Sequence, residues 1–306
     1  MKGEGLSTGV PVAVSPEKEE KHTLFSDFSE LVKLRLTLFN LMTTLAGFYL
    51  GNPSVVNVGL LFHTLFGTAL VAFSASALNQ VVEREHDAQM TRTASRPIPA
   101  GRRGVAEVFV GALLAGVIGT AWLAFFVNGL AAALAAATLL SYVLVYTPMK
   151  RYSTLNTLVG AVPGALPPVI GFAGAREEVG PQAYTLFAIL FFWQLPHFLA
   201  IAWLYRDEYR KAGFQMISGN DPKGDKTSLH SLYTAAALLP IGLLPTLFGI
   251  AGKAYFWGAF LIGATFCWTA WRFFKRRDNA SARVLFFASI IYLPLILGLM
   301  AYDAVK

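Results

Sequence analysis

The sequence predicts an all-α, polytopic membrane protein, and its composition gives the first reason. The chain has 306 residues, of which 55% are hydrophobic and only 14% are charged, and its mean hydropathy is +0.52. A soluble domain carries about 25% charged residues. The second reason is that the apolar residues form continuous runs of about 20, the length of a membrane-spanning helix. They do not alternate with polar residues as they would in a membrane β-barrel.

Nine such runs predict a bundle of nine transmembrane helices. They cover residues 36–52, 57–82, 105–126, 129–147, 154–174, 183–204, 230–250, 254–271 and 282–302. The single Cys267 lies in the eighth run, so the chain has no disulfide framework. The fifth run contains Gly160, Gly164 and Pro163, a composition that favours close helix packing and a broken helix.

The distribution of basic residues is the third observation, and it orients the bundle. All but three of the 25 Lys and Arg residues lie in the N-terminal segment or in the loops after runs two, four, six and eight. The exceptions are Arg176, Lys253 and Lys306. Because cytoplasmic loops are enriched in Lys and Arg, this split predicts a cytoplasmic N-terminus and an external C-terminus. It also explains much of the net charge of +7, so no nucleic-acid partner is expected.

The first 24 residues differ from the rest of the chain. They are polar and include the mixed-charge stretch SPEKEEKHT. They lack the apolar core of a signal peptide, and their glutamates are untypical of a transit peptide. We therefore predict a disordered cytoplasmic tail over residues 1–24 and one transmembrane domain over residues 25–306.

Three polar residues at the end of the second run lie four residues apart: Asn79, Glu83 and Asp87. If the helix continues past residue 87, they share one face. Two carboxylates and an amide provide the hard oxygen ligands that Mg²⁺ takes together with substrate phosphates. The alternative is an ordinary charged helix end in solvent. Since Asn79 lies inside the apolar run, where polar groups are costly, we favour a metal and catalytic site.

Two arginines, Arg92 and Arg96, follow the acidic residues and are also four residues apart. We expect the helix to continue through both arginines and to end at Pro97 and Pro99. Each arginine could then bind phosphate through paired hydrogen bonds. Metal ligands beside phosphate-binding arginines predict a diphosphate site.

The motif Asn-x-x-x-Glu-x-x-x-Asp, followed by MTRTASRPIPAG, resembles the first acidic motif of the UbiA-type membrane prenyltransferases. The trailing segment is similar to the protohaem IX farnesyltransferase (haem O synthase) branch. Residues 33–51, 146–172 with GALPP, and 191–216 with WQLPHF resemble the same branch in the same order. Position 83 is Glu where the wider superfamily usually has Asp. The second acidic motif, paired aspartates in many relatives, is reduced here to Asp207, Glu208 and Tyr209. Which residue would bind a second metal ion, and whether there is one, is therefore left open.

The resemblance implies a helical bundle with a central intramembrane cavity in the bacterial cytoplasmic (inner) membrane. The implied donor is farnesyl diphosphate, the cofactor Mg²⁺ and the acceptor haem B (protohaem IX). Farnesyl transfer to a haem vinyl group with water addition would give the hydroxyethylfarnesyl group of haem O. Haem A synthase or terminal oxidase assembly proteins are the protein partners that such an activity suggests.

Further candidates lie at the cytoplasmic ends of later runs. Lys150 and Arg151 follow the fourth run and could bind phosphate or a haem propionate, or simply set the topology. After the sixth run, Glu208 is a catalytic candidate that could complete the metal site, and Asp207 and Lys211 are substrate-binding candidates. The alternative for these three is an amphipathic loop helix.

Gln194 and His197 lie inside the sixth run, beside Pro196. An isolated intramembrane His is often a hydrogen-bonded packing residue. Together with a Gln and a proline break, we interpret the pair as part of the substrate pocket, with haem contact as one role and axial ligation of the iron as another.

Three other functions fit part of these observations. A sibling enzyme would prenylate an aromatic quinone precursor or chlorophyllide in place of haem. A transporter would also have many spans with polar residues, but carboxylates gathered at one membrane edge beside arginines speak against it. A binding or assembly partner of an oxidase would leave Glu83 and Asp87 unexplained.

Overall fold

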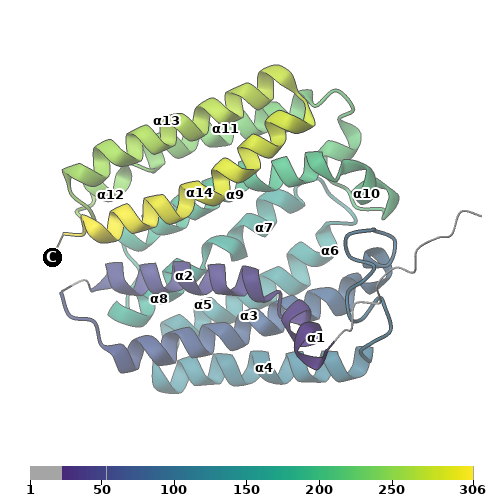
Figure 1. Cartoon of the computed structure of the whole chain (residues 1–306). Helices are drawn as coiled ribbons and strands as arrows, with labels where there is room; N and C mark the ends of the chain where they lie inside the picture. Colours follow the sequence, from purple (N-terminus) through teal and green to yellow (C-terminus); the bar gives the residue numbers. More distant parts are fainter. Residues whose placement is uncertain (1–22, 53, 306) are drawn as a thin grey trace, which may run out of the picture.

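The computed structural model describes residues 23–52 and 54–305, and nearly all of their regular structure is helical. The long helices lie side by side in one bundle (Figure 1). In chain order the helices are α1 Leu24–Leu31, α2 Leu34–Gly51, α3 Val58–Asp87, α4 Val105–Phe126, α5 Gly129–Leu140, the π-helix η1 Ser141–Tyr146, α6 Thr147–Met149, α7 Asn156–Ala165, α8 Pro167–Arg176, α9 Pro181–Leu204, α10 Arg206–Lys211, the 3₁₀-helix η2 Ile217–Asn220, α11 Asp225–Ile241, α12 Leu244–Leu247, α13 Lys253–Arg276 and α14 Asn279–Tyr302.

The predicted N-terminal tail falls largely outside the described residues, which begin at Thr23. Thr23 is the N-cap of α1, and its side chain accepts a hydrogen bond from the Ser26 backbone N–H at 3.1 Å. Leu24 is already helical, so the folded domain includes the last two residues that the sequence assigned to the tail.

Seven helical segments in the described part of the chain are long and apolar enough to cross a membrane, or eight if the bent pair α1 and α2 is counted. The eighth predicted span, over residues 254–271, corresponds to α13, which is not among these segments. This helix has 24 residues and runs alongside α14 (Figure 1). It contains three Trp and one Tyr, residues that have low hydropathy values although their rings bury large apolar areas. The polytopic all-α class is confirmed, and the count of nine spans stays a prediction.

A sharp bend of 52° separates α1 from α2. Lys33 lies at the bend in the left-handed conformation, with φ 46°. Such a backbone is costly for a residue other than glycine and persists where surrounding contacts hold it. One such contact comes from α3, where Gln80 Nε2 donates to the carbonyl oxygens of Glu30 and Leu31, both at 2.9 Å. These bonds satisfy carbonyls at the end of α1, so α3 fixes the direction in which Lys33 leaves the bend.

Helix α3 ends at Asp87, which confirms that the acidic residues lie on one continuous helix. The prediction that the helix continues to Pro97 is wrong. Residues 88–103 form a series of turns, and Thr93 Oγ1 donates to the Asp87 carbonyl oxygen at 2.9 Å. That bond occupies one of the free carbonyls at the helix end and folds the chain back toward it.

Helices α2 and α8 pack in backbone contact. A methyl group added to Gly171 would overlap the Thr44 carbonyl oxygen, and one added to Gly47 would overlap that of Pro168. Small residues allow this approach between membrane helices. The segment α7–α8 and helix α9 are the most buried spans, at 67% and 61%. They form the middle of the bundle: α2, α3 and α5 pack against α8, and α11 and α14 pack against α9.

Candidate active site

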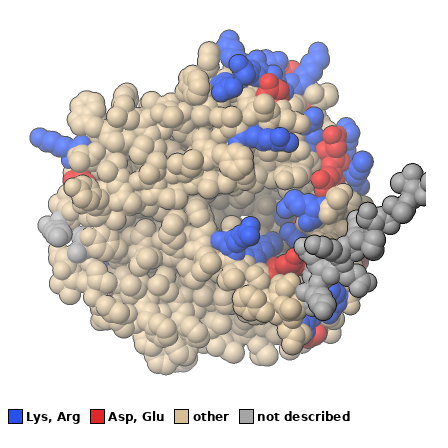
Figure 2. Space-filling model, viewed as in Figure 1, with Lys and Arg blue, Asp and Glu red and all other residues tan. Residues whose placement is uncertain are grey.

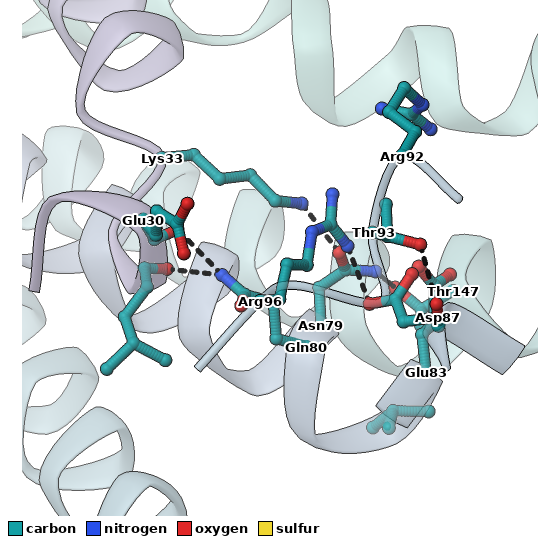
Figure 3. Close-up of polar contacts among 12 residues, drawn as sticks. Glu30, Lys33, Asn79, Gln80, Glu83, Asp87, Arg92, Thr93, Arg96 and Thr147 are labelled. Atoms are coloured by element: carbon teal, nitrogen blue, oxygen red, sulfur yellow. Dashed lines mark hydrogen bonds and ion pairs between the residues drawn. The ribbon is translucent and has the colours of Figure 1, made fainter. Parts of the chain in front are cut away.

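The three predicted metal ligands are almost fully buried at one end of the bundle. Their exposed fractions are 0% for Asn79, 4% for Glu83 and 1% for Asp87. They lie on successive turns of α3 and face the space between the α1–α2 bend and residues 92–96 (Figure 3). Buried polar groups of this kind require partners, because an unpaired charge in the interior is costly.

Each of the three residues has a different basic partner. Lys33 Nζ donates to Asn79 Oδ1 at 2.7 Å, and Arg96 Nη1 donates to Asp87 Oδ2 at 2.6 Å (Figure 3). Lys150 Nζ lies 2.7 Å from Glu83 Oε1. The three basic side chains come from the α1–α2 bend, the turns after α3 and the end of α6, so three distant segments converge on one face of α3. In each pair the basic side chain offsets part of the cost of removing the polar group from water.

The site has three basic side chains for two carboxylates, which suits the binding of an anion. Burial lowers the pKa of Lys150, but the adjacent Glu83 carboxylate outweighs it and holds that pKa above its usual range. Lys150 therefore stays charged at neutral pH. In this buried position its charge is little screened by salt.

The orientation of the Asn79 amide is fixed by a short hydrogen-bond chain. Asn79 Nδ2 donates to Thr147 Oγ1 at 3.2 Å, and Thr147 Oγ1 donates to the Tyr142 carbonyl oxygen at 2.8 Å. The amide oxygen consequently points to Lys33, on the side of Glu83 and Asp87 (Figure 3). Thr147, which the sequence did not single out, thus presents Asn79 as an oxygen ligand.

The donor set fits a metal ion that also binds substrate. Within residues 23–52 and 54–305, no three His, Cys, Asp or Glu side chains are grouped closely enough to hold a metal by themselves. Two carboxylates and an amide oxygen are hard donors, and Mg²⁺ is commonly bound by one or two carboxylates plus phosphate oxygens. Asn79, Glu83 and Asp87 could therefore hold a metal that a diphosphate also ligates.

The end of α9 and helix α10 meet the turns after α3. The Arg92 backbone N–H donates to Glu208 Oε2 and Arg92 Nη2 donates to Tyr209 Oη, both at 3.4 Å. The Arg92 guanidinium also lies over the Tyr205 ring, 5.3 Å from its centroid. Glu208 and Arg92 are therefore brought together where α10 meets the turns after α3.

Two other predicted residues of α10 lie on the surface. Asp207 pairs with Arg210 at 2.9 Å, and their side chains are 63% and 66% exposed. Lys211, the last residue of α10, is exposed as well. Arg151 points elsewhere, since its Nη2 donates to the Val82 carbonyl oxygen at 2.7 Å and so braces α3.

The intramembrane pair Gln194 and His197 makes well-defined contacts. Gln194 Nε2 donates to the carbonyl oxygens of Ala161 and Leu190, at 2.8 and 3.1 Å, which joins α7 to α9. His197 Nδ1 lies 2.7 Å from Ser289 Oγ on α14. Ser289 Oγ itself donates to the Phe286 carbonyl oxygen, so it accepts from Nδ1–H and leaves the lone pair on His197 Nε2. The Gln194 contacts stabilise the helix pair, whereas His197 keeps a free acceptor.

Lys and Arg side chains gather at the end of the bundle that contains this site (Figure 2). Several of them border a hollow in the visible face, and the opposite end shows few. The end of the bundle that contains the site therefore presents a basic surface, which would attract an anionic group.

Comparison with known proteins defines the class. The model of the UbiA prenyltransferase family matches residues 40–291, and the chain belongs to this family. With its apolar helices, it is an integral membrane protein. It is 42% identical over 286 residues to the protoheme IX farnesyltransferase of Solibacter usitatus, covering 90% of this chain and 98% of that one.

Two solved structures share the fold. One, of digeranylgeranylglyceryl phosphate synthase, has a TM-score of 0.78 at 15% identity and covers 92% of this chain and 99% of that one. The other is a UbiA homologue from Archaeoglobus fulgidus bound to DMAPP and Mg²⁺. Its TM-score is 0.64 at 14% identity, with 90% and 99% of the two chains covered. At these identities the likeness establishes the fold alone.

Proposed function

We propose that this protein is a protohaem IX farnesyltransferase, which transfers farnesyl from farnesyl diphosphate to a vinyl group of haem B and so makes haem O. One observation carries the proposal: Asn79, Glu83 and Asp87 are buried together at one end of an apolar bundle, each in contact with a different basic side chain, an arrangement suited to a metal-bound diphosphate. The farnesyl acceptor is inferred from the similarity to protoheme IX farnesyltransferases.

The donor half of the reaction follows from the chemistry of the site. Mg²⁺, held by Asn79, Glu83 and Asp87, would neutralise charge on the diphosphate leaving group. The basic side chains that now contact these residues, Lys33, Lys150 and Arg96, would donate hydrogen bonds to diphosphate oxygens. These donors act where negative charge develops as the allylic C–O bond breaks.

The remaining residues of the proposed metal and diphosphate site would come from the contact between α10 and the turns after α3. Glu208 accepts from the Arg92 N–H, and it is the candidate that would complete the metal site. Arg92 would bind the outer phosphate. Asp207 and Lys211 are exposed and would act at the entrance, while Arg151 would support α3 without touching substrate.

The acceptor half would lie deeper in the bundle, in the cavity that the family resemblance implies. The farnesyl chain needs an apolar path, which the helices supply. His197, with its free Nε2, would face the haem edge or the water that ends the reaction, and axial ligation of the iron is a further role it could fill. Gln194 would shape this region by holding α7 against α9.

We further propose that the site end is cytoplasmic and that the protein lies in a bacterial inner membrane. Among the described residues, the basic side chains gather at the site end, which supports this orientation (Figure 2). A haem A synthase or oxidase assembly proteins would then receive the product.

The acceptor can be tested directly. Membranes that contain the protein should be given radiolabelled farnesyl diphosphate with haem B, with 4-hydroxybenzoate, or with both. Label should enter the haem fraction in the first and third mixtures and stay out of the aromatic acid. Labelling of 4-hydroxybenzoate with haem B untouched would establish the sibling aromatic prenyltransferase.

A further inference from the structure

Helix α1 is short and amphipathic, and its apolar side is the exposed one. Its eight residues, LFSDFSEL, place Leu24, Phe25 and Phe28 on one side and Asp27 and Glu30 on the other. Leu24 is 76% exposed, Phe25 72% and Phe28 50%, whereas Asp27 is buried. The arrangement is the reverse of a surface helix in a soluble protein, which turns its polar side outward.

Ion pairs hold the polar side of α1 against the start of α4. Asp27 accepts from Arg102 Nε at 2.9 Å and from Arg103 Nε at 3.3 Å. Arg102 Nη2 also donates to Glu30 Oε2 at 3.3 Å. Both arginines lie just before α4 begins, at the end of the bundle that contains the site. These pairs fix which side of α1 faces away from the protein.

The apolar side of α1 extends toward the middle of the bundle. The rings of Phe28 and Phe73 meet edge to face, with their centroids 6.0 Å apart. Phe73 lies on α3 at about 21 Å from Asp87, the last residue of that helix, at 1.5 Å per residue. The charged side chains of α1 therefore lie toward the end of the bundle and the rings toward its apolar part. A helix that lies in a membrane interface has this arrangement.

Lipid is the partner that suits this face. Residues 1–22, which precede α1, include seven charged residues, one Leu and no aromatic residue, so they offer little apolar surface to cover it. A second copy of the chain would need about 800 Å² per partner for a stable interface. Three large apolar side chains offer only about 200 Å² each, even when fully exposed.

The end of α1 also determines where Lys33 lies. Helix α1 runs into the 52° bend, where the Lys33 backbone is left-handed. Gln80 holds the carbonyl oxygens of Glu30 and Leu31 just before the bend. Rotation of α1 about this end would consequently move Lys33 Nζ away from Asn79 Oδ1, to which it donates at 2.7 Å.

We propose that α1 lies in the membrane interface at the site end, with Leu24, Phe25 and Phe28 among lipid acyl chains, and that this placement keeps Lys33 on Asn79. The second part rests on the diphosphate site proposed above. Helix α1 is then not the first turn of a span, and the bend marks the point where the chain passes from the interface into the bundle.

The position of α1 can be measured without any assay of activity. In a Cys267→Ser background, single cysteines should replace Leu24, Phe25 or Ser29, the last of which lies outside the apolar side, and each should be labelled with bimane. The full chain is placed in phosphatidylcholine nanodiscs with or without lipids brominated near the top of the acyl chain. Iodide in the buffer is the second quencher.

We expect brominated lipid to quench the probes at positions 24 and 25, with little quenching by iodide, and to quench the probe at position 29 less. Two positions guard against one label that disturbs the helix. Quenching of both by iodide alone would place this side of α1 in water, and protection from both quenchers would mean that protein covers it. Either result would overturn the inference.

The link to Lys33 is tested by ligand binding. Leu24→Ser combined with Phe25→Ser should raise the Kd of farnesyl thiolodiphosphate, which resists ionisation, by up to the about 10-fold that loss of one hydrogen bond to a charged group costs. Phe125→Ser, at the other end of α4 with Phe125 84% exposed, is the matched control and should leave Kd unchanged. In a Lys33→Met background the two serines should add nothing, because the residue through which they act is gone.

An unchanged Kd in the double-serine variant would overturn the positioning role, and so would an equal rise in the Lys33→Met background. If the unmodified protein does not bind the analogue, it is the proposed function that fails. The quenching result would still show where α1 lies.

Discussion

Lys33 Nζ donates to Asn79 Oδ1 at 2.7 Å, although the two residues are 46 positions apart in the chain. The lysine reaches this oxygen because its backbone is left-handed at the bend between α1 and α2. The bend is held in turn by Gln80, the neighbour of Asn79 on α3. One helix, α3, thus supplies both Asn79, the proposed metal ligand, and the residue that supports its basic partner.

Replacement of this lysine should weaken substrate binding. Lys33→Met keeps most of the apolar stem but removes a donor to the diphosphate. Since hydrogen bonds to charged groups contribute about 1.5–3 kcal/mol, the KM for farnesyl diphosphate should rise about 10- to 100-fold. Steady-state kinetics on purified protein would measure it. Arg35→Ala, an exposed residue two positions further along, is the matched control and should leave KM unchanged. Equal kinetics in both variants would remove Lys33 from the site.

Activity should require a divalent metal and Asp87. Chelation of Mg²⁺ should abolish turnover, and added Mg²⁺ should restore it, because the hard oxygen ligands lie on one face of α3. Asp87→Ala should lose at least about 100-fold in kcat while remaining folded and membrane-inserted, which size-exclusion chromatography in detergent would confirm. Near-normal turnover in this variant would contradict the assignment of Asp87.

The acidic face was predictable because it is a local property of one helix. A spacing of four residues places Asn79, Glu83 and Asp87 on one side of any α-helix, and α3 does extend to Asp87. The same rule failed for Arg92 and Arg96, because the chain leaves the helix after Asp87. There, Arg96 reaches Asp87 through a turn.

The basic partners could not be predicted from local patterns. In the sequence, Lys33 is one of the basic residues that orient the chain in the membrane. Its contact with Asn79 depends on its own left-handed backbone and on the 52° bend between α1 and α2. The contact of Thr147 with Asn79 depends on a π-turn, which a regular 3.6-residue period does not reveal. Only the fold shows that Thr147 faces α3.

The contact between α2 and α8 should be sensitive to a single methyl group. Gly171→Ala places Cβ against the Thr44 carbonyl oxygen of the backbone, which cannot move aside as a side chain could. Overpacking costs about 1–3 kcal/mol, so the midpoint of thermal unfolding in detergent should fall by several degrees. Gly111→Ala in α4, where an added methyl meets no atom within 4 Å, should leave it nearly unchanged. A stable Gly171→Ala variant would contradict the described packing.

The proposed orientation makes a prediction for reporter fusions. A reporter placed after Gly101, in the turns beside the site, should read cytoplasmic, and one fused at Lys306 should read external. Activities of paired alkaline phosphatase and fluorescent protein fusions would measure this. If both positions report the same side, an even number of segments crosses the membrane between Gly101 and Lys306, and the count of nine spans is wrong.

In the proposed reaction a haem vinyl group captures the farnesyl cation, and water then adds to the cation that this leaves on the vinyl carbon. An aromatic acceptor would lose a ring proton and gain the prenyl group alone. The cation left after vinyl attack lies beside the macrocycle, where addition of water and loss of its proton complete the reaction. Purified protein should be incubated with haem B, farnesyl diphosphate and Mg²⁺ in H₂¹⁸O, and the product mass determined. We expect a product with the mass of haem B plus a farnesyl and one hydroxyl group, with the hydroxyl oxygen labelled. A product without the hydroxyl, or one whose hydroxyl carries no ¹⁸O, would contradict it.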